Sequence, residues 1–170
     1  RRRELGLFTS RANAFLVLRS PTIFATAVLG VGLMLIYFAW LFSAVAIYDR
    51  YFGAETPQSV MAFANQVATT PAGWALIIRG SGIGFVFAVL VLTLSVVSFP
   101  MLRDRDVGIL TAIWTSVRAV AENPVTFALW GFVVAAALII GSLPFFVGLA
   151  VVLPVLGHAT WHLYRKVVEY

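Results

Sequence analysis

The amino-acid sequence predicts an all-α fold, a polytopic transmembrane helical bundle that forms a single domain over residues 1–170. Two features of the composition predict it: 61% of the residues are hydrophobic and 11% are charged, against about 45–50% and about 25% in soluble domains. The third observation is the stretch 123–164, which contains no Asp, Glu, Lys or Arg. It is about twice as long as the roughly 20 residues that a helix needs to cross a bilayer.

The charge-free windows predict four spans, at about 22–47, 82–100, 125–140 and 145–162. The last two would form a hairpin, with Gly141-Ser142-Leu143-Pro144 as the turn between them. A single long kinked helix across 125–162 is the alternative.

The distribution of basic residues favours the hairpin. If the N-terminus is cytoplasmic, only Arg50 and Arg79 fall outside, so ten of the twelve basic residues are inside. A single third span would move Arg165 and Lys166 outside and weaken this bias. We therefore expect a multi-pass protein of the bacterial inner membrane with both termini cytoplasmic. The same topology accounts for the net charge of +5 without nucleic acid as a partner.

Two shorter amphipathic helices are expected at the membrane surface. One covers about 57–70, after a Thr56-Pro57 start that resembles a cap with a first-turn proline. The other covers about 106–122, with Asp106 as the expected cap and apolar residues at helical spacing. It would lie along the cytoplasmic interface or dock on the bundle.

Small residues four apart predict places where helices approach closely. The candidate helix-packing residues are Gly80, Gly84, Gly131, Ala135, Ala137 and Gly141. The run Gly80-Ser81-Gly82-Ile83-Gly84 is not a dinucleotide-binding loop, because no strand precedes it and Phe85 stands where that fingerprint needs glycine.

Charged and aromatic residues near the expected cytoplasmic boundary are candidate contacts for anionic lipid or a partner subunit. They are Arg103, Arg105, Trp114, Arg118, His158, Trp161, His162, Arg165 and Lys166. His158 and His162 share one helix face, so they cannot hold a haem iron from opposite sides. The chain has no cysteine, which excludes thiolate chemistry. No catalytic, cofactor or metal site is predicted.

The segments 99–106 (FPMLRDRD) and 152–166 (VLPVLGHATWHLYRK) resemble a family of uncharacterised proteobacterial inner-membrane proteins. Some of its members carry the label of a cytochrome c oxidase subunit. The resemblance covers residues 90–167 and, more loosely, the first span. It implies an earlier hairpin whose tail would be Arg1-Arg2-Arg3-Glu4, and hence six spans in the whole protein. The chain lacks the mid-membrane histidines of catalytic oxidase subunits, so within an oxidase it would be accessory.

The leading hypothesis is a non-catalytic accessory subunit of a respiratory or other energy-converting membrane complex, which acts by packing against partner subunits and lipid. A small transporter or channel is the alternative, and would need a polar pathway involving Ser95, Ser98 or Arg79. A third hypothesis is an enzyme acting on lipids, with His158, His162 and the cluster 103–106.

Overall fold

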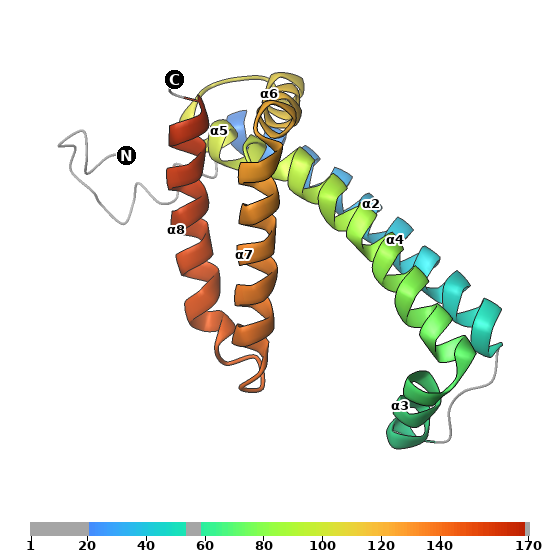
Figure 1. Ribbon diagram of the computed structural model, residues 1–170. Helices are drawn as coiled ribbons and strands as arrows, with labels where there is room; N and C mark the ends of the chain where they lie inside the picture. Colours follow the sequence, from blue (N-terminus) through green and yellow to red (C-terminus); the bar gives the residue numbers. More distant parts are fainter. Residues whose placement is uncertain (1–20, 54–58, 169–170) are drawn as a thin grey trace. The chain divides into compact units, whose positions relative to one another are not determined.

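The computed structural model describes residues 21–53 and 59–168, and these are folded into helices joined by short turns (Figure 1). The helices are α2 (Pro21–Phe52), α3 (Val60–Thr69), α4 (Pro71–Ser95), α5 (Ser98–Asp104), α6 (Ile109–Glu122), α7 (Pro124–Ser142) and α8 (Leu149–Val168). The expected N-terminal tail, the Thr56-Pro57 start and Glu169 lie outside the described residues.

The chain divides into two compact units. The central unit is residues 31–92, which holds most of α2, all of α3 and most of α4. The C-terminal unit is residues 93–170 together with the chain up to Gly30, and its packed elements are α5, α6, α7 and α8.

Three helical stretches of the described chain are long and apolar enough to cross a membrane: Ile23–Phe52, Pro71–Asp104 and Pro124–Ser142. The prediction of an all-helical membrane protein is confirmed to that extent. The fourth expected span coincides with α8, which is not among the three. Its second half carries His158, His162, Arg165 and Lys166, and these polar side chains lower its average hydrophobicity.

The helices that contain the first two expected spans extend beyond the expected limits of those spans, which were placed at charged residues. α2 continues past residue 47 to Phe52 and ends at Gly53, whose φ of 69° suits a glycine. α4 begins at Pro71 rather than at 82. Arg79 lies within α4, and its guanidinium carbon sits 5.5 Å from the centre of the Tyr51 ring. The charge is thus accommodated on the helix surface.

Helices form over both stretches expected to lie at the membrane surface, as α3 and α6. The Ser59 side chain caps α3 by accepting a hydrogen bond from the Ala62 N–H at 3.1 Å. α6 starts at Ile109 with Gly108 as its N-cap, so Asp106 is not the cap. Its apolar residues were expected to bind the bundle or the interface. The residues that it buries are instead the small Ala112, Ser116 and Ala119, which share one face.

The elbow between α3 and α4 depends on Thr70 and Gly73. The Thr70 N–H donates to Gln66 O at the end of α3, while its hydroxyl accepts from the Gly73 N–H at 3.0 Å. A Cβ on Gly73 would lie 2.5 Å from Val67 Cα and closer still to Val67 O. Only glycine therefore allows this close approach.

Residues 124–168 form two packed helices, so the single kinked helix is wrong (Figure 1). The turn covers residues 143–148 rather than 141–144, and α8 begins at Leu149 rather than at 145. A Cβ on Gly148 would lie 2.7 Å from Gly141 O. This close approach of two glycines lets the helices join without a longer loop.

Candidate functional site

The most buried part of the described chain lies where α5, α6, α7 and α8 meet in the C-terminal unit. The largest fully buried side chains are Tyr164, Phe127, Leu102, Val97, Ser98 and Ser116. Because three of these side chains carry a hydroxyl group, the core has polar groups that must be hydrogen-bonded.

Ser116 of α6 occupies the break between α4 and α5. Its hydroxyl donates to Thr93 O at 2.7 Å and accepts from the Val97 N–H at 3.2 Å. In a continuous helix this N–H would bond directly to Thr93 O, four residues earlier. The Ser116 oxygen is therefore inserted into the helical hydrogen-bond ladder, which is a recognised cause of helix kinks. This insertion explains why the second apolar helix stops at Ser95 and resumes at Ser98.

Ser98 supplies a second link between the same elements. Its hydroxyl lies 2.7 Å from Leu94 O of α4 and 3.1 Å from Ala112 O of α6. The close packing is possible because Ala112 and Ser116 are small. All buried side-chain nitrogen and oxygen atoms among the described residues have hydrogen-bond partners, so this junction is a satisfied polar network.

Tyr164 joins the end of α8 to the end of α5. It is 1% exposed, and its hydroxyl donates to Asp104 Oδ2 at 3.2 Å. Arg105 Nε lies 3.9 Å from the same carboxylate. Burial, and secondly the negative charge of Asp104, raise the pKa of Tyr164 above its usual value. Trp161 packs one turn earlier, with its ring centre 5.6 Å from that of Tyr164.

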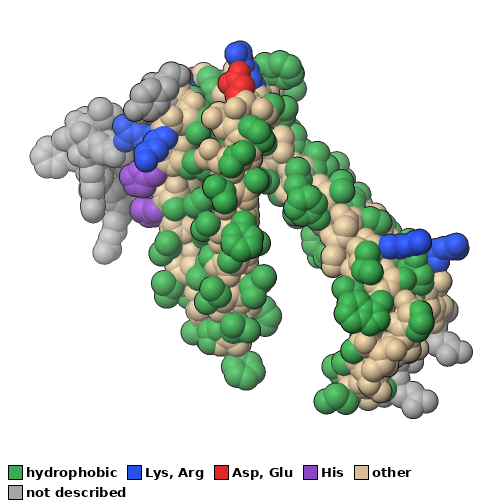
Figure 2. Space-filling view, viewed as in Figure 1, with side chains coloured by type: hydrophobic (Ala, Val, Ile, Leu, Met, Phe, Trp, Pro, Cys, Tyr) green, Lys and Arg blue, Asp and Glu red, His purple; other side chains and the backbone are tan. Residues whose placement is uncertain are grey.

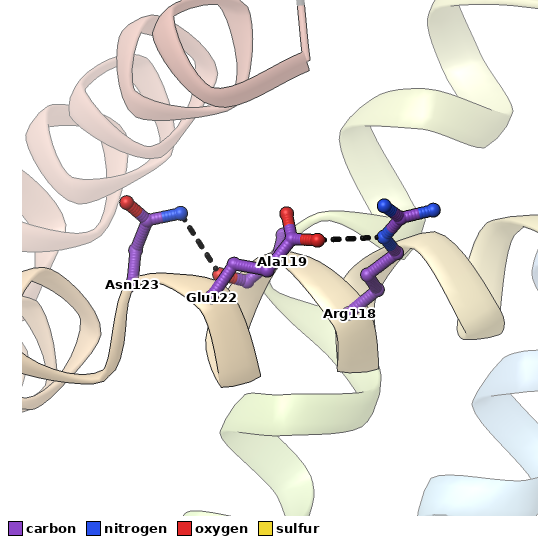
Figure 3. A network of polar contacts seen from close by, with 4 residues as sticks. All are labelled: Arg118, Ala119, Glu122 and Asn123. Carbon is purple, nitrogen blue, oxygen red and sulfur yellow. Dashed lines mark hydrogen bonds and ion pairs between the residues drawn. The ribbon is translucent and has the colours of Figure 1, made fainter.

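The exposed side of α6 carries an ion pair. Arg118 Nε donates to Glu122 Oε1 at 2.7 Å, and Asn123 Nδ2 donates to Ala119 O at 3.3 Å as the helix ends (Figure 3). The hydrogen bond to Glu122, followed by its charge, raises the pKa of Arg118. Both side chains are more than half exposed, so the pair contributes little to stability.

The predicted lipid or partner contacts all lie in the C-terminal unit. The exposed ones are Arg103, Arg105, Trp114, Arg118, His158, His162 and Lys166, while Trp161 and Arg165 are half-buried. Figure 2 shows the histidines and neighbouring basic side chains toward one end of α7 and α8, with hydrophobic side chains around the turn. The histidines and these basic side chains thus lie toward one end of the hairpin, and the contacts of the nine residues with lipid or a partner stay predictions.

The histidines lie on the surface of α8. His158 Nδ1 is 3.2 Å from Pro154 O, a contact within its own helix. Among the described residues, no group of three His, Cys, Asp or Glu side chains is placed to hold a metal ion.

The predicted helix-packing residues fall into both units. In the central unit a Cβ on Gly80 would meet nothing within 4 Å, and one on Gly84 would lie 3.6 Å from Trp40 Nε1. In the C-terminal unit a Cβ on Gly141 would lie 3.0 Å from both Leu149 Cδ2 and Val152 Cγ2. Gly131, Ala135 and Ala137 lie on the same helix, α7.

An open apolar groove of ≈ 350 Å³ lies between α2 and α4 in the central unit. It is lined by Leu33, Ile36, Tyr37, Trp40, Gly84, Phe87, Ala88 and Val91. On α4, Gly80, Gly84 and Ala88 stand four apart, so one stripe of small residues runs along the helix into the groove. Sequence reasoning identified the two glycines and missed the groove, because the α2 wall could not be paired with α4 from spacing alone.

The comparison with protein families gives a match over the first part of the chain. Residues 1–104 match the family described as Predicted integral membrane protein (DUF2189), and residues 105–170 lie outside that match. No curated protein and no solved structure matches the chain. The expectation of a membrane family without an assigned function is confirmed, while a proteobacterial origin and the oxidase label stay predictions. Because the match covers more than half of its length, the chain belongs to the DUF2189 family of predicted integral membrane proteins.

Proposed function

We propose that this protein is a non-catalytic accessory subunit of a bacterial inner-membrane complex, which acts by packing its helices against other integral subunits and lipid. A respiratory or other energy-converting complex is the proposed setting, in keeping with the sequence resemblance. The single observation that carries the proposal is the groove between α2 and α4, with its stripe of small residues on a helix that can cross a membrane.

The proposed occupant of the groove is a helix of a partner subunit. Small residues let helix backbones approach closely in a membrane, where packing and not the hydrophobic effect drives association. Gly80 is open to its surroundings and continues the line of Gly84 and Ala88 in the groove wall. The partner helix would therefore contact the stripe at Gly80 and the aromatic side chains of Tyr37 and Trp40 farther along.

In the proposed arrangement α2, α4 and the α7–α8 pair make four membrane segments, with both termini cytoplasmic. The basic residues of the C-terminal unit would then lie on the cytoplasmic side, where anionic lipid is abundant. Arg50 and Arg79 of the central unit would lie on the outer side. The bias of basic residues toward the cytoplasm supports this orientation.

Co-purification of the full chain in mild detergent tests the proposal. The wild type should migrate in an assembly with other integral membrane proteins, and the Gly80→Leu variant should lose them, because the leucine would fill the space at the stripe. The matched control is Ser81→Leu, on the next residue of α4, whose side chain is exposed. It should keep the partners.

Three results would reject the proposal. The wild-type chain could migrate alone, or both variants could retain the same partners. A liposome flux that requires the purified chain and is lost on changing Ser95 or Arg79 would favour the transporter alternative instead.

A further inference from the structure

The turn between α7 and α8 is apolar at every position that it exposes. Leu143, Phe145, Phe146 and Val147 are 76%, 94%, 68% and 72% exposed. Pro144 completes the exposed run. A hairpin turn that faces water normally consists of glycine, asparagine, aspartate and serine. This composition indicates that the surroundings of the turn are not water.

Several backbone N–H groups of the turn form hydrogen bonds within the hairpin. The N–H groups of Phe146, Val147 and Leu149 donate to Ser142 O, Pro144 O and Phe146 O at 3.0–3.1 Å. The Ser142 hydroxyl also bonds back into its helix, to Leu138 O at 2.7 Å. Where no water is present, polar backbone groups must be paired internally, and these three N–H groups are paired within the chain.

Two phenylalanines occupy backbone conformations that favour glycine. Phe145 has a φ of 49° and Phe146 a φ of 65°. A left-handed conformation costs energy for residues with a Cβ atom. Large aromatic side chains at these two positions therefore indicate that the exposed rings make favourable contacts outside the chain.

The length of α7 limits how far the turn can reach. Its 19 residues cover about 28 Å, whereas the hydrocarbon core is about 30 Å thick and the whole bilayer about 40–45 Å. α7 begins at Pro124, directly after the exposed Glu122 and Asn123. With those residues at the membrane surface, the turn ends before the opposite aqueous phase.

The polar residues of α8 set a second limit. His158 lies nine residues after Leu149, which is about 14 Å along the helix. If the turn emerged on the far side, His158 would lie near the bilayer centre, where polar side chains are costly. A turn that stays inside the bilayer places both histidines closer to the membrane surface, on the side where α8 carries Arg165 and Lys166.

We propose that α7 and α8 form a hairpin that enters and leaves the membrane on one side, with residues 143–147 held inside the bilayer against lipid acyl chains. This inference rests on the membrane arrangement above and not on the accessory function. It accounts for the exposed apolar turn, its internal hydrogen bonds and the short apolar part of α8.

Single-cysteine labelling tests the proposal, because the chain has no cysteine of its own. Phe145→Cys and Val147→Cys are treated in intact cells and then in permeabilised cells with a membrane-impermeant maleimide. Asn65→Cys on α3 and Asp106→Cys before α6 are the controls for the two aqueous sides, since both side chains are exposed and polar. We expect the turn variants to react at less than a tenth of the control rate from either side.

Fluorescence quenching identifies what covers the turn. The same cysteines, labelled with bimane in detergent and returned to liposomes, should be quenched by lipids that carry a nitroxide on the acyl chain. Phe132→Cys, 73% exposed on α7, is the matched lipid-facing control. Labelling at more than a tenth of the control rate would overturn the proposal. Failure of the nitroxide lipids to quench would also overturn it, because the turn would then be covered by protein.

Discussion

The two units are built on different principles. The C-terminal unit has a core of its own, in which Ser116 and Ser98 hold the α4–α5 junction and Tyr164 reaches Asp104 from α8. In the central unit Gly73 is the buried residue among those described, and the apolar side chains of α2 and α4 face outward or into an open groove.

This difference indicates that the central unit depends more on surrounding lipid or protein than the C-terminal unit does. A helix that is apolar all round needs lipid or protein to cover it, and the central unit presents such helices with few internal contacts. Substitutions in the C-terminal unit should therefore lower the stability of the protein itself. Substitutions in the central unit should spare stability and change association.

The largest expected difference in stability is between alanine substitutions of two phenylalanines, one in each unit. Phe127→Ala removes a side chain that is 1% exposed in the C-terminal unit, and we expect the free energy of unfolding to fall by about 3 kcal/mol. Phe85→Ala, at a position 70% exposed in the central unit, should change it by less than about 0.5 kcal/mol. Denaturant titration of both variants in the same detergent measures the difference. Equal losses would show that the two units do not differ in this way.

Glycines provide the next comparison. Gly148→Ala places a Cβ 2.7 Å from Gly141 O, a backbone atom that cannot move alone, and should cost about 2 kcal/mol. Gly82→Ala, where nothing lies within 4 Å, should be neutral or stabilise its helix by up to about 1 kcal/mol. Thermal unfolding followed by tryptophan fluorescence reports both. A wild-type midpoint for the Gly148→Ala variant would contradict the close approach of the two glycines.

Alanine substitutions of two serines, one in each unit, should also differ in their effect on stability. Ser116→Ala leaves the buried Val97 N–H without its partner and should cost about 1–3 kcal/mol. The Ser81→Ala control, on the exposed surface of α4, should be silent. Amide hydrogen exchange adds a local reading, since the Val97 amide should exchange faster in the Ser116→Ala variant. Unchanged exchange there would mean that Ser116 does not hold the junction.

Much of the fold could be predicted from the sequence because apolar runs and charge-free windows depend on composition. The pair of helices α7 and α8 was expected from the stretch 123–164, and three helical stretches of the described chain are long and apolar enough to cross a membrane. Boundaries were harder to place. Arg79 was taken as the end of a span, yet its charge rests over the Tyr51 ring and the helix runs through it.

The contacts that hold the C-terminal core could not be predicted. Ser116 reaches residues 23 and 19 positions away in the chain, and its place in the sequence gives no sign of such a role. Tyr164 and Asp104 are 60 residues apart. The close approaches at Gly73 and Gly148 were not predicted, because the atoms that a Cβ there would contact are known only from the folded chain.

The smallest expected effect concerns the Tyr164 hydroxyl. Its pKa is raised in the folded protein by burial and by Asp104, so the native state keeps this proton at a pH where the unfolded chain has lost it. The contribution is complete below about pH 10, the usual tyrosine pKa, and declines as the pH rises through the higher folded value. Tyr164→Phe should lower the free energy of unfolding by about 1 kcal/mol at neutral pH and reduce the loss of stability at alkaline pH. Tyr37→Phe, at a position 54% exposed in the central unit, is the control and should show the same alkaline loss as the wild type. Measurements of the free energy of unfolding between pH 8 and about pH 11 provide the test. If the alkaline loss of stability in the Tyr164→Phe variant equals that of the wild type, ionisation of Tyr164 does not contribute to it.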